Sequence, residues 1–312
     1  MVRVLAGKFS RAERIRQRQR IVLDDAALAP KTQCRYYNAL RKGLPTVEKA
    51  KHMDHLDSLL CDWIRLMWKT GEPLLTIGDS LSALHFFVPA TKRRIPHSWK
   101  LFGVWRRVEV PSRAPPLTLR IVRSLAAFEL SLGNLEMACC LTLGFHCLLR
   151  TGELLALHLD DLLLGKSSGI CTLQNTKTGV RHNAAEAISI EDVVVLELLQ
   201  SLKIYRRQMH LTALPLWSGS GSQFRQRFAA LCKHFGLCQH GFRPYSLRRG
   251  GATDLFQKTH SMELALLRGR WESCKVAKLY ISDGLSHLPK LKMSPHTHSL
   301  FRKFYFLNPQ DG

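Results

Sequence analysis

The sequence predicts a mainly α-helical protein of two domains, with one small antiparallel β-sheet in the second domain. Residues 30–109 carry apolar side chains at helical spacing. Three prolines lie in the segment 110–117 and interrupt helix on both sides, which predicts a linker there. Short runs of strand-like composition follow at 159–164, 170–174 and 186–190, and these predict the sheet.

Size and charge limit the kind of protein this can be. The chain has 312 residues, of which 46% are hydrophobic, so it can bury a core in one large domain or two modest ones. Its 46 Lys and Arg against 24 Asp and Glu give a formal net charge of +22. Such an excess favours a polyanionic partner, and nucleic acid is the first candidate. Charge alone does not separate DNA from RNA or from an anionic membrane.

Membrane and redox features predict an intracellular protein. No apolar run reaches the roughly 20 residues of a membrane-spanning helix, so no membrane partner is expected. The N-terminus is too polar for the apolar core of a secretory signal. Nine cysteines with no C-x-x-C pair indicate reduced thiols. We expect the protein in the nucleus if the source is eukaryotic, and with the nucleoid if it is bacterial or phage.

Residues 1–28 are expected to form a basic arm. Seven cationic side chains lie there on no single helical face: Arg3, Lys8, Arg11, Arg14, Arg16, Arg18 and Arg20. The arm is either solvated or lies along phosphates. A mitochondrial transit peptide is a weaker interpretation, because Glu13, Asp24 and Asp25 are acidic.

Four helices are expected in the first domain, residues 29–109. Thr32 can cap the first helix, because its hydroxyl can accept from a free backbone N–H group. The second helix carries apolar residues at helical spacing over 53–67, and the third and fourth cover about 77–87 and 99–108.

The second domain is expected to cover residues 118–285, followed by a tail at 286–312. Its predicted helices cover about 118–131, 134–148, 191–206, 221–235, 245–258, 261–268 and 273–281. Thr151 can cap a further helix that carries Glu153 in its first turn.

Three residues near the C-terminus have the chemistry for phosphodiester cleavage. Trp271 follows Arg248 by 23 residues, and Tyr280 follows Trp271 by 9. Metal-independent cleavage needs fixed positive charge on the phosphate, a nucleophile held in line and a proton for the leaving 5′-hydroxyl. Arginine meets the first need, because its planar fork binds phosphate bidentately and stays charged. Nearby cations would favour the reactive phenolate form of a tyrosine.

An earlier arginine completes a family pattern. Arg150 ends an apolar helix in LLRTGELLAL, with Glu153 three residues on. With YSLRR, GRW and LY later in the chain, this segment resembles the tyrosine recombinase family. That family has Leu-x-Arg-x-x-Glu, then His-x-x-Arg, then His or Trp, then the nucleophilic Tyr. Tyr245 stands where His or Lys is usual. The chain is similar to Cre-like and phage-type integrases, or to recombinases of eukaryotic mobile elements.

The resemblance implies a role for each matched residue. The implied catalytic set is Arg150, Lys177, Tyr245, Arg248, Trp271 and Tyr280. Tyr280 would attack to give a 3′-phosphotyrosine, and Lys177, in the turn TKTG of a β-hairpin, would protonate the leaving group. Glu153 would orient Arg150 without touching substrate.

Three further cations are expected to contact DNA. They are Arg249, Arg270 and Lys275, which flank the matched residues. Arg249 points about 100° away from Arg248 on the same helix, so we interpret it as a phosphate-neutralising or solvated side chain.

The resemblance also implies a fold and partners. The helical first domain would bind the DNA core, and with the catalytic domain would form a C-shaped clamp around double-stranded DNA. No metal and no nucleotide cofactor are implied. The family works as a homo-tetramer on DNA, and we expect a monomer or dimer when free. The tail, 286–312, would pass between protomers, anchored by Phe301, Phe304 and Phe306.

Other interpretations stay open. The chain could be a catalytically inactive DNA-binding descendant of a recombinase, which Tyr245 favours. It could be a type IB topoisomerase-like enzyme with the same chemistry. An RNA-binding module is less favoured, because no aromatic RNA-binding signature appears.

A zinc site is disfavoured. Metal-capable side chains occur at Cys232, His234, Cys238 and His240, but their C-x-H-x3-C-x-H spacing is not that of known zinc sites.

Overall fold

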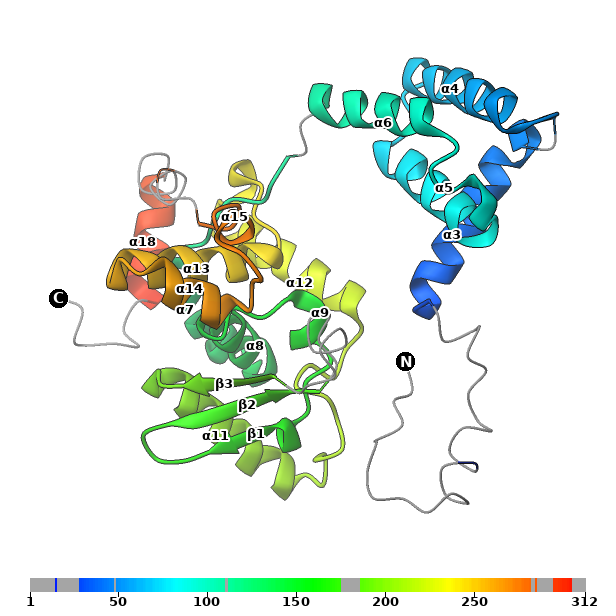
Figure 1. The fold of residues 1–312 in the computed structure, drawn as a ribbon. Helices are drawn as coiled ribbons and strands as arrows, with labels where there is room; N and C mark the ends of the chain where they lie inside the picture. Colours follow the sequence, from blue (N-terminus) through cyan, green and yellow to red (C-terminus); the bar gives the residue numbers. More distant parts are fainter. Residues whose placement is uncertain are drawn as a thin grey trace. The chain divides into compact units, whose positions relative to one another are not determined.

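The computed structural model describes residues 15, 28–47, 49–109, 112–174, 186–281, 284 and 294–304. The chain forms two compact units, Met1–Ser112 and Arg113–Gly312, here called unit 1 and unit 2 (Figure 1). The expected mainly helical fold with a small antiparallel sheet is confirmed. Among the described residues, no helix is both long enough and apolar enough to cross a lipid bilayer.

Unit 1 is built from helices around a small apolar core. Its helices are α3 (Pro30–Val47), α4 (Met53–Lys69), α5 (Leu74–Phe87), the 3₁₀ turn η1 (Pro89–Thr91) and α6 (Pro96–Val108). The core joins α4, α5 and α6 through side chains such as Ile64, Leu81 and Trp105. Helix α6 begins three residues before the predicted start, because proline is tolerated at the first position of a helix.

A buried carboxylate joins two helices of unit 1. Asp57 on α4 accepts from the backbone N–H groups of His97, at 2.9 Å, and Ser98, at 2.8 Å, and so caps the start of α6. Burial acts to raise the pKa of Asp57, but hydrogen bonds from Ser98 and His97 outweigh it and lower the pKa.

Unit 2 combines helices with the sheet. Its helices are α7 (Leu119–Ser131), α8 (Leu135–His146), α9 (Thr151–Leu154), α11 (Val193–Gln208), α12 (Gly221–His234), α13 (Tyr245–Thr259), α14 (Met262–Gly269), α15 (Cys274–Ala277) and α18 (Pro295–Phe304), with 3₁₀ turns η2 (Leu159–Asp161) and η3 (Cys238–His240). Helix α8 is buried along almost its whole length, and α7, α11 and α13 pack around it.

The sheet is a three-stranded antiparallel meander. Its strands are β1 (Leu162–Leu164), β2 (Gly169–Leu173) and β3 (Glu186–Ile190), in the order β1-β2-β3. Cys171 pairs with Ile188 in β3, and both residues are buried. Helix α11 lies along one face of the sheet (Figure 1). The predicted strand at 159–164 is shorter than expected, because its first three residues form the turn η2.

Helix α18 packs on its own unit. Phe301 is fully buried, and its ring stacks on Phe235 at 5.3 Å between centroids. Phe304 packs edge-on against Phe128 at 5.3 Å. The predicted passage of this segment between protomers stays a prediction, and Phe306 lies outside the described residues.

Two glycines bring α13 very close to its neighbours. A Cβ atom on Gly250 would lie 2.1 Å from the carbonyl oxygen of Leu117, and one on Gly251 would lie 2.0 Å from that of Phe145. The side-chain-free face of this helix is therefore filled by backbone of the protein itself.

Replacing Asp57 by alanine should reduce the stability of unit 1 by about 2–3 kcal/mol, because two N–H groups at the start of α6 lose their acceptor. The pKa of Asp57 is lowered in the folded state, so its contribution is present at neutral pH and is lost as the pH falls through the folded pKa. Thermal unfolding followed by tryptophan fluorescence at neutral and acidic pH measures this. Asp62→Ala, which removes an exposed pair with Arg65, should cost under about 0.5 kcal/mol. Equal losses from both variants would contradict the capping role.

Replacing Gly251 by alanine should destabilise unit 2 by about 3 kcal/mol or more, because the new methyl group collides with a backbone carbonyl that cannot rotate away. Urea unfolding followed by circular dichroism measures this. The control is Gly103→Ala in α6, where a Cβ atom meets nothing within 4 Å, and helix propensity should make it neutral or slightly stabilising. A Gly251→Ala protein as stable as the wild type would show that α13 can move away.

Candidate active site

The described members of the predicted catalytic set lie together in unit 2. Arg150 precedes α9, and Arg248 lies in the first turn and a half of α13. Trp271 follows the left-handed residue that ends α14, and Tyr280 lies in the turn after α15. Segments that are far apart in the sequence thus supply side chains to one place.

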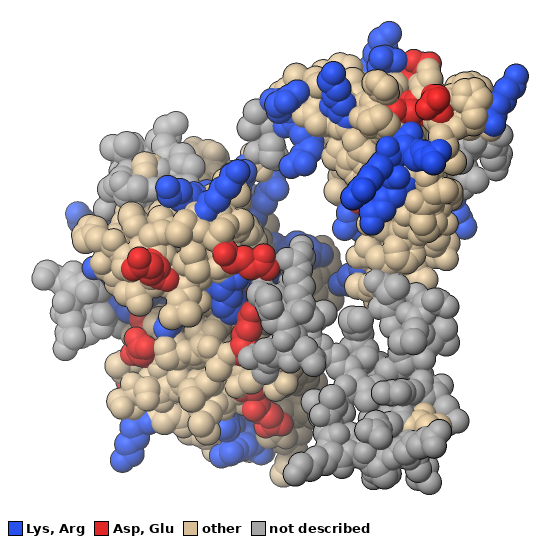
Figure 2. Space-filling model, viewed as in Figure 1, with Lys and Arg blue, Asp and Glu red and all other residues tan. Residues whose placement is uncertain are grey.

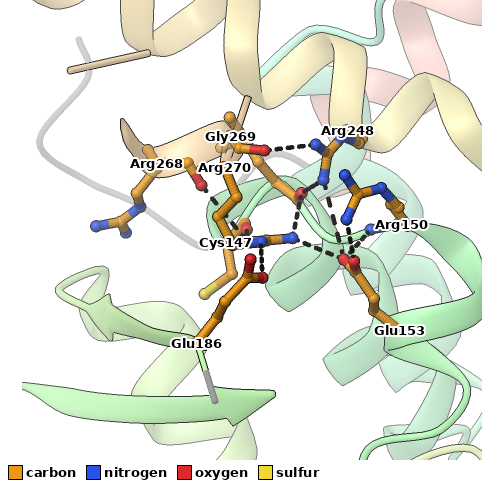
Figure 3. A network of polar contacts seen from close by, with 9 residues as sticks. Cys147, Arg150, Glu153, Glu186, Arg248, Arg268, Gly269 and Arg270 are labelled. Carbon is orange, nitrogen blue, oxygen red and sulfur yellow. Dashed lines mark hydrogen bonds and ion pairs between the residues drawn. The ribbon is translucent and has the colours of Figure 1, made fainter. Parts of the chain in front are cut away.

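Arg248 is at the centre of this arrangement and is fully buried. Its Nη1 donates to the carbonyl oxygen of Leu148 and its Nη2 to that of Gly269 (Figure 3). The guanidinium carbon lies 4.9 Å from the centroid of the Trp271 ring and 5.4 Å from that of Tyr280. Burial, together with the charges of Arg270 and Arg150, lowers the pKa of Arg248 to about 10, so the group stays cationic at neutral pH.

Tyr280 is packed between two other rings. Its centroid lies 4.5 Å from that of Trp271 and 5.8 Å from that of Tyr245. Burial and a hydrogen bond with Tyr280 raise the pKa of Tyr245 above its ordinary value. The Tyr245 hydroxyl is therefore protonated at neutral pH and contacts the other tyrosine hydroxyl.

The Glu153 carboxylate lies between Arg150 and Arg248. One carboxylate oxygen accepts from the backbone N–H of Arg150 at 2.8 Å, and the other accepts from the Arg150 guanidinium. The same carboxylate lies 3.9 Å from Arg248 Nη1 and accepts from Arg270 Nη2 at 2.6 Å (Figure 3). Burial acts to raise the pKa of Glu153, but the charges of Arg270 and Arg150 lower it overall, so it is ionised at neutral pH.

Two donors in the site have no acceptor. The Nε atom of Arg248 and the Nε1 atom of Trp271 are buried, and neither has a hydrogen-bond partner among the described residues. A buried donor left unsatisfied costs about 1–3 kcal/mol, so such groups are expected where a ligand supplies the missing acceptor. Both donors suit an anion with several oxygen atoms, such as a phosphate.

The other predicted site residues are Lys177, Lys275, Arg249 and Arg270. Lys177 lies outside the described residues. Lys275 is exposed on α15. Arg249 is only 4% exposed, so the solvated interpretation is wrong, and its predicted contact with DNA stays a prediction. The side chain of Arg270 is 7% exposed and ion-paired with two carboxylates, and its predicted contact with DNA also stays a prediction.

The sequence reasoning missed the backbone acceptors and one carboxylate. The carbonyls of Leu148 and Gly269 hold Arg248, and Glu186 on β3 lies 3.0 Å from Arg270 Nε. No motif marks these groups. The glycine of GRW was the available signal for a tight turn beside the site.

Comparison with solved structures finds similar folds. The Tn1549 transposon integrase in complex with transposon right end DNA is 16% identical, with a TM-score of 0.59, over 90% of this chain and 97% of that one. A lambda integrase dimer bound to a COC′ core site is 15% identical, with a TM-score of 0.54, over 90% of this chain and 83% of that one. No protein-family model and no curated protein matches the sequence. The expected tyrosine recombinase fold is thereby confirmed.

Replacing Tyr280 by phenylalanine should lower the pKa of Tyr245 toward its ordinary value, because the hydrogen bond between the two hydroxyls is lost while the burial remains. Titration of ¹³C-labelled tyrosine by NMR measures this. Tyr205→Phe, which removes an exposed hydroxyl on α11, should leave the titration of Tyr245 unchanged. An unshifted Tyr245 in the Tyr280→Phe protein would show that the two hydroxyls do not interact.

Proposed function

We propose that this chain is a tyrosine recombinase, a metal-independent DNA strand transferase that works through a 3′-phosphotyrosine intermediate. One observation carries the proposal. Arg150, Arg248, Tyr245, Trp271 and Tyr280 converge on one site, in which two buried donors lack acceptors. A phosphodiester group supplies the anionic oxygens that these donors need.

The cations would hold the scissile phosphate. Arg150 has a side chain that is 28% exposed, so it can present its planar fork to a non-bridging oxygen. Arg248 and Trp271 offer their free Nε and Nε1 donors to the same group. Because both donors are buried, the groups that cover them must move before a phosphate can reach them. Once bound, the phosphate would have its negative charge stabilised by both donors.

Tyr280 would carry the covalent step. Its hydroxyl oxygen attacks the phosphorus atom, a bond forms between them, and the bond from phosphorus to the 5′-oxygen breaks. The tyrosine proton passes to solvent, and the leaving 5′-oxygen takes up a proton, for which Lys177 is the proposed donor. Attack by a 5′-hydroxyl of another strand reverses the step, so the phosphotyrosine bond stores the energy for rejoining.

Double-stranded DNA is the proposed partner. The net charge of +22 supports a polyanion, and the two similar integrase structures were solved with DNA. Lysine and arginine side chains gather on the visible face of unit 1 (Figure 2). The exposed cations of this unit include Lys92, Arg93, Arg94, Arg106 and Arg107. By the same proposal the chain acts as a homo-tetramer on DNA, and it works in the nucleus or at the nucleoid.

A second candidate is a catalytically inactive DNA-binding descendant. The position where the family has His or Lys holds Tyr245, whose raised pKa prevents it from taking a proton at neutral pH as histidine does. Binding of duplex DNA without any covalent product would favour this candidate. Relaxation of supercoiled plasmid without sequence preference would favour a type IB topoisomerase-like enzyme instead.

The wild-type protein should form a covalent adduct with a pool of nicked duplexes of random sequence, because loss of the short cleaved strand traps the phosphotyrosine. Denaturing electrophoresis with labelled DNA detects the adduct. Tyr280→Phe should abolish it, since the ring can still pack but has no nucleophilic oxygen. Tyr205→Phe should form as much adduct as the wild type. A wild-type protein that gives no more adduct than Tyr280→Phe would contradict the enzymatic proposal.

A further inference from the structure

Arg270 has an unusual backbone for an arginine. It ends α14 in the left-handed conformation, with φ of 54°, immediately before Trp271. That conformation costs a side chain with a Cβ atom roughly 1–2 kcal/mol, and glycine is the usual occupant. Residues in such conformations persist where the surrounding contacts over-determine them. The side-chain contacts of Arg270 therefore indicate its role.

Those contacts point inward to two carboxylates on different elements. Arg270 Nη2 donates to Glu153 on α9 at 2.6 Å, and Nε lies 3.0 Å from Glu186 on β3 (Figure 3). Nη1 also donates to the carbonyl oxygen of Cys147 at 3.3 Å. One guanidinium thus joins α9, β3 and the turn after α8.

The first consequence concerns the charge beside Arg248. The carboxylate oxygen of Glu153 that Arg270 binds also lies 3.9 Å from Arg248 Nη1. Opposite charges this close attract strongly where water is largely excluded. Without Arg270, this carboxylate would draw Arg248 toward itself and compete with an incoming phosphate.

The second consequence concerns the two neighbours of Arg270 in the chain. The carbonyl oxygen of Gly269 accepts from Arg248 Nη2, and the ring of Trp271 covers the Arg248 guanidinium. Anchoring the Arg270 side chain fixes the backbone of this turn, and so fixes both groups that contact Arg248. Arg270 thus affects Arg248 in two ways: it neutralises the nearby Glu153 carboxylate, and it fixes the backbone that contacts Arg248.

We propose that Arg270 is a positioning residue: by binding Glu153 and Glu186 it keeps Arg248 available to one phosphate of the DNA backbone. This inference rests on the proposed function, but it makes a separate statement about anion binding. Arg270 itself touches no phosphate. It acts through Glu153, so removing the charge of Glu153 should compensate for the loss of Arg270.

The test uses the full chain, inorganic phosphate as the probe and the indole N–H signal of Trp271 in a ¹H–¹⁵N spectrum, assigned with Trp271→Phe. Arg270→Met should weaken phosphate binding by about tenfold or more, because Glu153 then competes for Arg248. The double variant Arg270→Met/Glu153→Gln should recover most of that loss, since glutamine still accepts from the Arg150 N–H but carries no charge. Arg270→Lys keeps the charge but can reach only one carboxylate, so its phosphate affinity should lie between those of the wild type and Arg270→Met. This variant replaces Arg270→Met in the test if Arg270→Met does not fold.

A matched control separates positioning from general damage to the turn. Arg268→Met lies two residues away and loses contacts to Ser189 and His146, but Arg268 does not contact Glu153. It should bind phosphate as the wild type does. The inference is overturned if folded Arg270→Met or Arg270→Lys binds phosphate within twofold of the wild type, or if the double variant binds no better than Arg270→Met.

The covalent assay distinguishes this inference from the proposed function. If the wild type forms the covalent adduct and Arg270→Met forms it at the same rate, the inference about Arg270 is overturned, but the proposed enzymatic function stands. Absence of a wild-type adduct, with phosphate binding lost in Arg270→Met and recovered in the double variant, would support the inference in a protein that binds DNA without cleaving it.

Discussion

The carboxylate of Glu153 is the group on which the candidate site depends. Three guanidinium groups, from Arg150, Arg248 and Arg270, lie around it, and two of these side chains are almost completely buried. Cations that close together in a poorly hydrated region repel one another and lose their hydration, which is tolerable only with a compensating anion. Glu153 supplies the anion, so the three arginines can lie together without any bound ligand.

Two backbone carbonyls supply further acceptors for the arginines of the site. The oxygens of Leu148 and Gly269 accept from Arg248, and Leu148, with φ of 49°, and Arg270 both have left-handed backbone. Such conformations cost on the order of 1–3 kcal/mol each and gather where a function needs a particular direction. Here the left-handed residues direct the carbonyl groups of Leu148 and Gly269 toward the buried guanidinium of Arg248 on α13.

The sequence predicted the side chains of the site better than their surroundings. Arg248, Trp271 and Tyr280 are found because their types and spacing resemble the pattern of the tyrosine recombinase family. The sheet and most helices follow from periodicity. The left-handed backbone at Arg270 is not encoded in any local pattern, because glycine is the residue that normally signals it. Likewise, the burial of Arg249 depends on how distant segments cover α13, and helical spacing alone does not contain that information.

The glycine pair of α13 determines which parts of the site can adjust. Gly250 and Gly251 let the carbonyls of Leu117 and Phe145 approach so closely that α13 has no room to slide or rotate against them. The helix that carries Arg248 is therefore locked in place by main-chain atoms. Tyr280, in contrast, follows the four-residue helix α15, most of whose surface is open to solvent. Any change in the distance between the Tyr280 and Arg248 side chains must then come from movement of Tyr280, while Arg248 stays in place.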